Sequence, residues 1–133
     1  MDSRQMKDHK PVTVSVHDLR DESTDEVQLS GKLVDNETRC RHWHSNLDVI
    51  AIRFKCCDIF FACYECHKEE QDHQVVVWSK EEIDSPRIRT ILCGVCKYWM
   101  HTKEYFDCGS TCPYCKAGFN PYCSLHYDLY FEM

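Results

Sequence analysis

Residues 56–67 read CCDIFFACYECH, and this stretch decides how the chain folds. It begins with two adjacent cysteines and ends with a C-x-x-C pair followed by histidine, residues 63–67. The tight turn of a C-x-x-C pair lets two thiolates reach one metal ion. A short apolar stretch, residues 58–62, lies between the two pairs. A chain built this way is stabilised by metal ions more than by a large apolar core.

Beyond this stretch, the 133 residues contain 11 cysteines and 8 histidines. A disulfide framework, redox catalysis and metal ligation all use many cysteines. Disulfides need an oxidising compartment, and no secretory signal opens the chain. An odd number of cysteines also leaves one thiol unpaired. Zinc ligation explains why the histidines cluster among the cysteines, so we favour zinc.

Charge and hydropathy exclude several classes of partner. Lys and Arg total 16 against 22 for Asp and Glu, and the net charge of −6 argues against a nucleic-acid binder. No apolar run approaches the roughly 18 residues that span a membrane, which leaves open only peripheral contact with a membrane surface. Residues 1–39 mix acidic and basic side chains and form no basic amphipathic presequence.

The order of polar and apolar segments predicts one domain behind an extension. Residues 1–26 are polar and predict a flexible N-terminal extension. Residues 27–133 would form the domain, with two interleaved zinc sites in 27–78 and a four-cysteine, zinc-ribbon-like part in 87–133. The predicted fold class is a small metal-stabilised α+β, zinc-finger or ribbon-like domain. We expect short strands, short helical turns, much irregular structure and about three structural zinc ions.

Local patterns predict the individual elements. Residues 27–34, 48–55 and 74–78 are rich in β-branched and apolar side chains and predict strands. Residues 64–71 predict one or two helical turns. Ser79 is followed three residues later by Glu82, a capping box that predicts the start of a short helix.

Nine ligand candidates lie between residues 40 and 73, enough for two closed zinc sites if His44 is a surface residue. Grouping the C-x-H pair with the C-x-x-C pair forms one site. The remaining two cysteines and two histidines form the other, although an exchange of Cys56 or Cys57 between the sites stays open. The first site is Cys40, His42, Cys63 and Cys66, and the second is Cys56, Cys57, His67 and His73.

Two further C-x-x-C pairs, Cys93/Cys96 and Cys112/Cys115, are separated by 15 residues and predict a four-cysteine site. C-P-Y-C is also a dithiol redox motif, but there it opens a helix, which Gly118 here would interrupt. We therefore favour structural zinc. Two cysteines and one histidine have no clear site: Cys108, Cys123 and His126. They form a weaker fourth site together with His101 or are simply packed.

Together these motifs resemble the CHY-type zinc finger family. The strings that carry the resemblance are CRHWHSNLDVIAIRFKCCD at residues 40–58, ACYECHKE at 62–69 and DH at 72–73. The tail FNPYCSLHYDLYF at 119–131 narrows it to small stand-alone members. The resemblance implies three zinc ions held by the three ligand sets above and no enzymatic activity.

For these members the resemblance implies a place in the mitochondrial intermembrane space, with the cytosol as the alternative. It also implies a role as an accessory protein for assembly of the small Tim proteins. Its partners would be these proteins and the disulfide-relay oxidoreductase, which it would keep free of zinc. CHY domains also precede RING fingers in some ubiquitin ligases, so an interaction module of that type, or a general zinc-handling protein, is the alternative function.

Overall fold

A computed structural model describes residues 12–16, 25–31, 33–85, 87–120 and 130–132. Residues 1–11, 17–24, 32, 86, 121–129 and 133 are outside the description, and Cys123 and His126 are among them. The elements in chain order are β1 (Val12–Val16), β2 (Asp25–Ser30), β3 (Ile50–Phe54), β4 (Ile59–Phe61), α1 (Tyr64–Glu70), α2 (Lys80–Asp84), β5 (Arg89–Cys93), β6 (Trp99–His101) and α3 (Thr102–Phe106).

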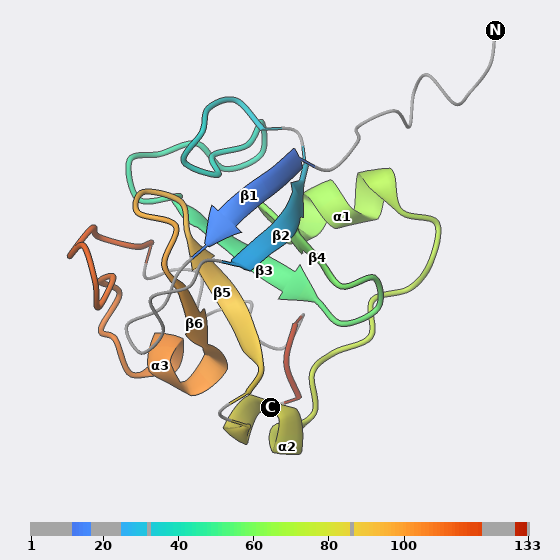
Figure 1. The fold of residues 1–133 in the computed structure, drawn as a ribbon. Helices are drawn as coiled ribbons and strands as arrows, with labels where there is room; N and C mark the ends of the chain where they lie inside the picture. Colours follow the sequence, from blue (N-terminus) through green and yellow to red (C-terminus); the bar gives the residue numbers. More distant parts are fainter. Residues whose placement is uncertain (1–11, 17–24, 32, 86, 121–129, 133) are drawn as a thin grey trace, which may run out of the picture.

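The six strands of the described residues join one mixed sheet with the order β1-β2-β4-β3-β5-β6 (Figure 1). β2 and β4 are parallel, and the other neighbours are antiparallel. The sheet is a strand-rich half-barrel, so our expectation of much irregular structure underestimated the strands. The reason is that two of the pairings, β2 with β4 and β3 with β5, join segments that are distant in sequence, which local patterns do not reveal.

The central hairpin β3–β4 places alternate side chains on opposite faces of the sheet. Phe54 and Phe61 lie in a core with the cysteines and the aromatic side chains of the second half of the chain. Ala51 and Phe60 lie in a smaller core on the other face with Val16 of β1. β5 pairs with β3, so the two predicted parts of the domain share one sheet.

Strand β1 lies inside the segment 1–26 that the sequence assigns to a flexible extension. It pairs along its whole length with β2, which begins at Asp25. Val16 is fully enclosed in the smaller core, and Val14 packs at its edge. The brief apolar alternation of Val12, Val14 and Val16, which is compatible with a short strand, is thus used in the sheet, although the acidic residues beside it favoured an extension.

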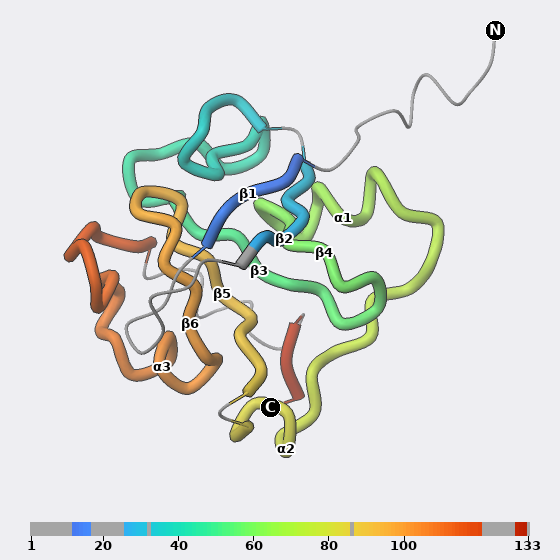
Figure 2. The backbone as a smooth tube through the Cα atoms, in the orientation of Figure 1, coloured from blue at the N-terminus to red at the C-terminus, as the bar shows by residue number. Residues whose placement is uncertain are grey.

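Two predictions concern segments outside the sheet: the start of α2 and a strand over residues 74–78. α2 has the expected capping box, because Ser79 Oγ accepts from the Glu82 N–H and Glu82 Oε1 accepts from the Ser79 N–H. The strand predicted over residues 74–78 is wrong, since only Trp78 makes a β-bridge, to Phe131. The tube in Figure 2 shows residues 71–79 running as an open connection from α1 to α2.

Candidate metal centres

The structure brings twelve of the predicted ligands into three groups of four, with their ligand atoms within 4.8 Å of one another. Each group has the membership that the sequence predicts. We call them cluster one, Cys40, His42, Cys63 and Cys66; cluster two, Cys56, Cys57, His67 and His73; and cluster three, Cys93, Cys96, Cys112 and Cys115.

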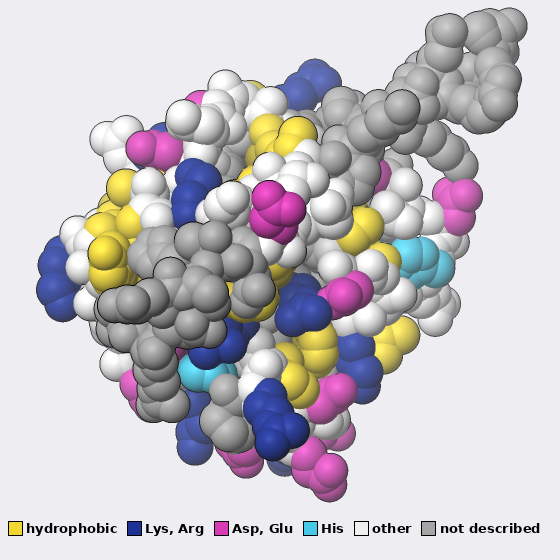
Figure 3. Space-filling view, in the orientation of Figure 1, with side chains coloured by type: hydrophobic (Ala, Val, Ile, Leu, Met, Phe, Trp, Pro, Cys, Tyr) yellow, Lys and Arg dark blue, Asp and Glu magenta, His cyan; other side chains and the backbone are white. Residues whose placement is uncertain are grey.

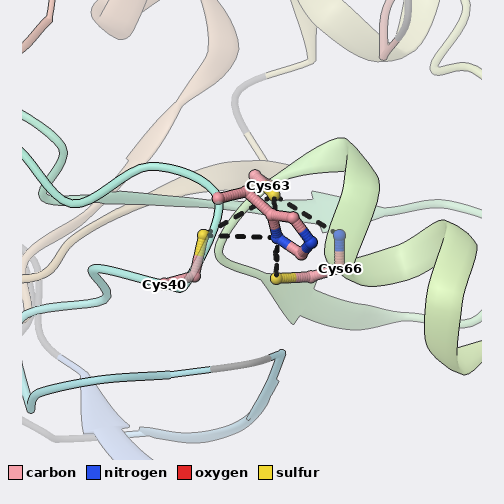
Figure 4. A group of neighbouring side chains, drawn as sticks. Cys40, Cys63 and Cys66 are labelled. Atoms are coloured by element: carbon pink, nitrogen blue, oxygen red, sulfur yellow. Dashed lines mark hydrogen bonds between the residues drawn. The ribbon is translucent and has the colours of Figure 1, made fainter.

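Cluster one joins the loop after β2 to the first turn of α1. Figure 4 shows the sulfurs of Cys40, Cys63 and Cys66 facing a common centre. The Cys63 sulfur lies 3.6 Å from each of the other two sulfurs. The fourth group, His42, points Nδ1 at the same centre, 3.4 to 3.8 Å from the three sulfurs.

These separations fit a zinc ion. Zinc binds sulfur at about 2.3 Å and nitrogen at about 2.0 Å, so tetrahedral ligands lie about 3.3 to 3.8 Å apart. Sulfur pairs in cluster three are 3.7 and 3.8 Å apart. In cluster two the Cys56 and Cys57 sulfurs are 3.9 Å apart, and His67 Nε2 is 3.2 Å from both Cys56 Sγ and His73 Nε2. All three donor sets therefore suit tetrahedral zinc.

Backbone N–H groups and one carboxylate support the ligands of cluster one. Cys63 is the N-cap of α1, and its sulfur accepts from the Cys66 N–H at 3.4 Å. The outward ring nitrogen of His42, Nε2, lies 3.0 Å from Glu69 Oε2. A carboxylate in this place fixes the tautomer and the orientation of a ligating histidine. No sequence motif marks Glu69 as a partner of the site, although its i,i+3 spacing from Cys66 places both on one helix face.

Three turns with the same backbone conformation carry six of the nine cysteines that belong to the clusters. In cluster three, Lys97 N donates to Cys93 O and Lys116 N to Cys112 O, at 2.9 and 3.0 Å. Both lysines have positive φ, 66° and 67°. The tight backbone of each turn brings its first and fourth residues to one centre.

The turn at Cys56 and Cys57 repeats this form with a different ligand pattern. Asp58 N donates to Phe54 O at 2.8 Å, and Asp58 has a φ of 60°. Phe54 thus occupies the first position of the turn, where the other two turns have a ligand. The third and fourth positions, Cys56 and Cys57, are the ligands instead. This arrangement explains how adjacent cysteines can face one centre.

Electrostatics favour a cation at each centre. Hydrogen bonds from Cys63 and Cys66 lower the pKa of Cys40 to about 2, so the other thiols stabilise one thiolate. Deprotonation of further thiols is opposed. In cluster one the hydrogen bond with Cys40 raises the pKa of Cys63, and in cluster two burial raises the pKa of Cys57 to about 12. Because several thiolates within 4 Å repel one another, full ligation requires a positive ion between them.

The histidine of cluster two on α1 is already in its ligating form. Burial, together with the nearby His73, lowers the pKa of His67 to about 4. Its ring stacks on Phe54 with centroids 4.3 Å apart and planes 10° apart. The neutral ring can offer a lone pair on Nε2, the atom that faces the other ligands.

The remaining candidates stand apart from the three clusters. His44 is exposed, as the sequence analysis expected. Cys108 is partly buried and joins none of the metal clusters found among the described residues, while Cys123 and His126 lie outside those residues. Cys112 is fully buried among three other thiols, a surrounding that suits ligation better than a redox dithiol.

Three clusters of four Cys and His side chains in a small fold define a zinc-finger protein. The sequence model of the CHY zinc finger family matches residues 40–105. The chain belongs to the CHY zinc finger family. The match includes clusters one and two and the first half of cluster three, while Cys112 and Cys115 lie beyond its end.

Relatives from yeasts resemble most of the chain. Helper of Tim protein 13 of Kluyveromyces lactis is 50% identical over 107 residues, which cover 80% of this chain and 90% of that protein. Helper of Tim protein 13 of Saccharomyces cerevisiae is 48% identical over 109 residues, covering 80% and 92%. An uncharacterised protein of Schizosaccharomyces pombe is 44% identical over 106 residues, covering 80% and 90%. No solved structure matches the chain.

Family and geometry together support zinc as the metal of these centres. Among the described residues, no helix is long and apolar enough to cross a bilayer, and α1 has only seven residues. On the face in Figure 3, Lys and Arg side chains are interspersed with Asp and Glu.

Proposed function

We propose that this protein is a non-enzymatic zinc-binding accessory protein that assists assembly of small Tim proteins in the mitochondrial intermembrane space. The similarity of 48 to 50% to two Helper of Tim proteins, over most of both chains, carries this proposal. The three clusters supply the chemistry, because each offers thiolates at tetrahedral spacing. We propose three bound zinc ions, one for each cluster.

The proposed action is to keep the disulfide-relay oxidoreductase free of zinc. Cysteines that must be oxidised to disulfides are blocked when a metal ion ligates them. A protein with clustered thiolates competes well for that metal, since soft sulfur ligands favour zinc. Withdrawal of zinc would leave the thiols of the oxidoreductase available for disulfide exchange with the small Tim proteins.

Complementation tests the proposal. A yeast strain without Helper of Tim protein 13 would express this chain, and two quantities would be measured: zinc bound to the isolated oxidoreductase and the oxidised fraction of the small Tim proteins. We expect less bound zinc and more oxidised Tim protein than in the empty-vector strain. Cys108→Ala, outside the clusters, is the control that should act like the wild type.

Location gives an independent check. We expect the protein to resist protease in intact mitochondria and to become digestible when the outer membrane is ruptured by swelling. A purely cytosolic or nuclear distribution, or unchanged zinc on the oxidoreductase, would refute the proposed function.

A further inference from the structure

The three clusters differ in how well the fold encloses them. Cluster one buries all three of its cysteines, and cluster three buries Cys93 and Cys112. In cluster two only His67 is buried, both cysteines are partly exposed and His73 is exposed. A competing ligand from outside can therefore approach cluster two more easily than the other two.

The turn that carries the cysteines of cluster two holds one ligand at a position that solvent can reach. The third residue of each equivalent turn in cluster three faces solvent, with Val95 42% and Tyr114 50% exposed. Cys56 stands at this third position of its own turn. Phe54 stands at the first position, and its side chain points inward and packs against His67. One thiolate of cluster two thus lies where the turn form exposes a side chain.

His73 adds a second point of access. It lies in residues 71–77, which form neither helix nor strand. Its ring meets His67 edge-on, with centroids 5.0 Å apart. A side chain on such a segment can move away through a local change of the backbone, without separation of any strands.

The other ligands of cluster two stay in place without help from a metal ion. Their turn connects β3 to β4, which are paired at Arg53–Phe60 and Phe54–Ile59. His67 is held between Phe54 and Phe61, the latter ring at 5.1 Å. By contrast, clusters one and three join segments outside the helices and strands, around residues 34–47 and 107–117. Loss of metal from cluster two therefore removes the least structure.

Ligand chemistry points the same way. Two thiolates and two neutral imidazoles balance the charge of one Zn²⁺ ion, whereas clusters one and three have three and four thiolates. Because zinc is held more firmly by additional thiolates, cluster two binds it least strongly of the three.

We propose that cluster two is the exchangeable zinc site of this protein and that clusters one and three keep their ions to maintain the fold. In the exchange, His73 leaves first and an incoming thiolate takes its place, so one zinc–nitrogen bond breaks as one zinc–sulfur bond forms. No electron is transferred. The identity of the natural thiolate partner rests on the proposed function, but the lability of this site does not.

Demetallation of the full-length, zinc-loaded protein tests the inference. EDTA in excess would be added, bound ions counted over time by native mass spectrometry, and free thiols pulse-labelled with N-ethylmaleimide and located by peptide mapping. We expect one ion to leave first, with labelling confined to Cys56 and Cys57 and an unchanged near-UV circular dichroism spectrum. Simultaneous loss of all ions, or first labelling in cluster one or three, would overturn the proposal.

A matched pair of variants isolates the histidine. His73→Asn should release the first ion about tenfold faster or more, while the other two ions stay bound. His44→Asn, an exposed histidine outside the clusters, should release it at the wild-type rate. Equal rates for the two variants would contradict the role of His73.

The two proposals can fail separately. If cluster two releases its ion first but complementation leaves zinc on the oxidoreductase, the exchange site stands and the function in Tim assembly is refuted. If complementation succeeds while all ions leave together, the function stands and the assignment of exchange to cluster two is refuted.

Discussion

Glu69 is a residue outside the ligand sets that acts on cluster one through a ligand. Its carboxylate lies 3.0 Å from His42 Nε2, and the other ring nitrogen faces the three sulfurs. The hydrogen bond keeps the proton on Nε2, so the lone pair of Nδ1 is directed at the centre. α1 carries both Glu69 and Cys66, and one rigid element therefore positions a ligand and the partner of another ligand.

Glu69→Gln should lower the zinc affinity of cluster one by about tenfold, because an amide is a weaker acceptor than a carboxylate and supports His42 less well. Competition with a chromogenic chelator measures the change. Glu65→Gln, exposed on the same helix, is the control and should leave the affinity unchanged. Equal affinities for the two variants would show that Glu69 has no such role.

Gly94 shows a second constraint at a single position. A Cβ here would overlap the Glu37 carbonyl oxygen and crowd Thr38 Oγ1, because the cluster three turn packs closely on the loop before cluster one. The glycine is required here by the close approach of this loop and not by backbone freedom, since the φ of Gly94 is not in the left-handed region.

Gly94→Ala should therefore lower the free energy of unfolding by about 1–3 kcal/mol, because backbone atoms must move to admit the methyl group. Gly118→Ala is the control, since its new Cβ would meet only the Leu47 side chain, which is exposed and can shift. Thermal unfolding of the zinc-saturated proteins compares them. A Gly94→Ala protein as stable as Gly118→Ala would contradict the close packing.

At the scale of elements, the sequence predicted the segments whose signal is local. β3 and α1 lie where an apolar run and a cysteine pair placed them, and α2 begins at the expected capping box. It also predicted the membership of the clusters, since the spacing of chelating pairs limits which residues can share an ion. β1 and β6 were harder, because a three- or five-residue strand is stable only through its partner in the sheet.

The capping box offers a test at this scale. Ser79→Ala should destabilise the protein by about 1 kcal/mol, because the Glu82 N–H loses its acceptor at the start of α2. Differential scanning calorimetry would show a fall of about 4 °C in Tm. Ser79→Asp keeps an acceptor oxygen and should retain most of the wild-type stability; an equal loss in both variants would argue against the cap.

At the scale of the whole molecule, the metal centres and the aromatic core form one structure. The buried cysteines of clusters one and three belong to the same core as Phe54, Phe61 and Phe119. Phe119 N also donates to Ser110 O in the loop that presents the second turn of cluster three. Packing and ligation are therefore coupled, and the spacing of ligands along the chain does not reveal this coupling.

Complete removal of metal should consequently unfold the domain. A chelator strong enough to empty clusters one and three is expected to abolish the near-UV circular dichroism signal cooperatively, and added zinc should restore it. The magnesium complex of the same chelator is the control. An unchanged near-UV spectrum after all metal is removed would mean that the ions do not support the fold.

The interleaving of clusters one and two has a consequence for synthesis. The first four ligands to leave the ribosome are Cys40, His42, Cys56 and Cys57, two from each cluster. Such a set can capture an ion in a pairing that the finished fold does not use. The native set of cluster one is complete only when the start of α1 has emerged, and that of cluster two only when His73 has followed, so a chain kept free of metal until then avoids rearranging its ligands.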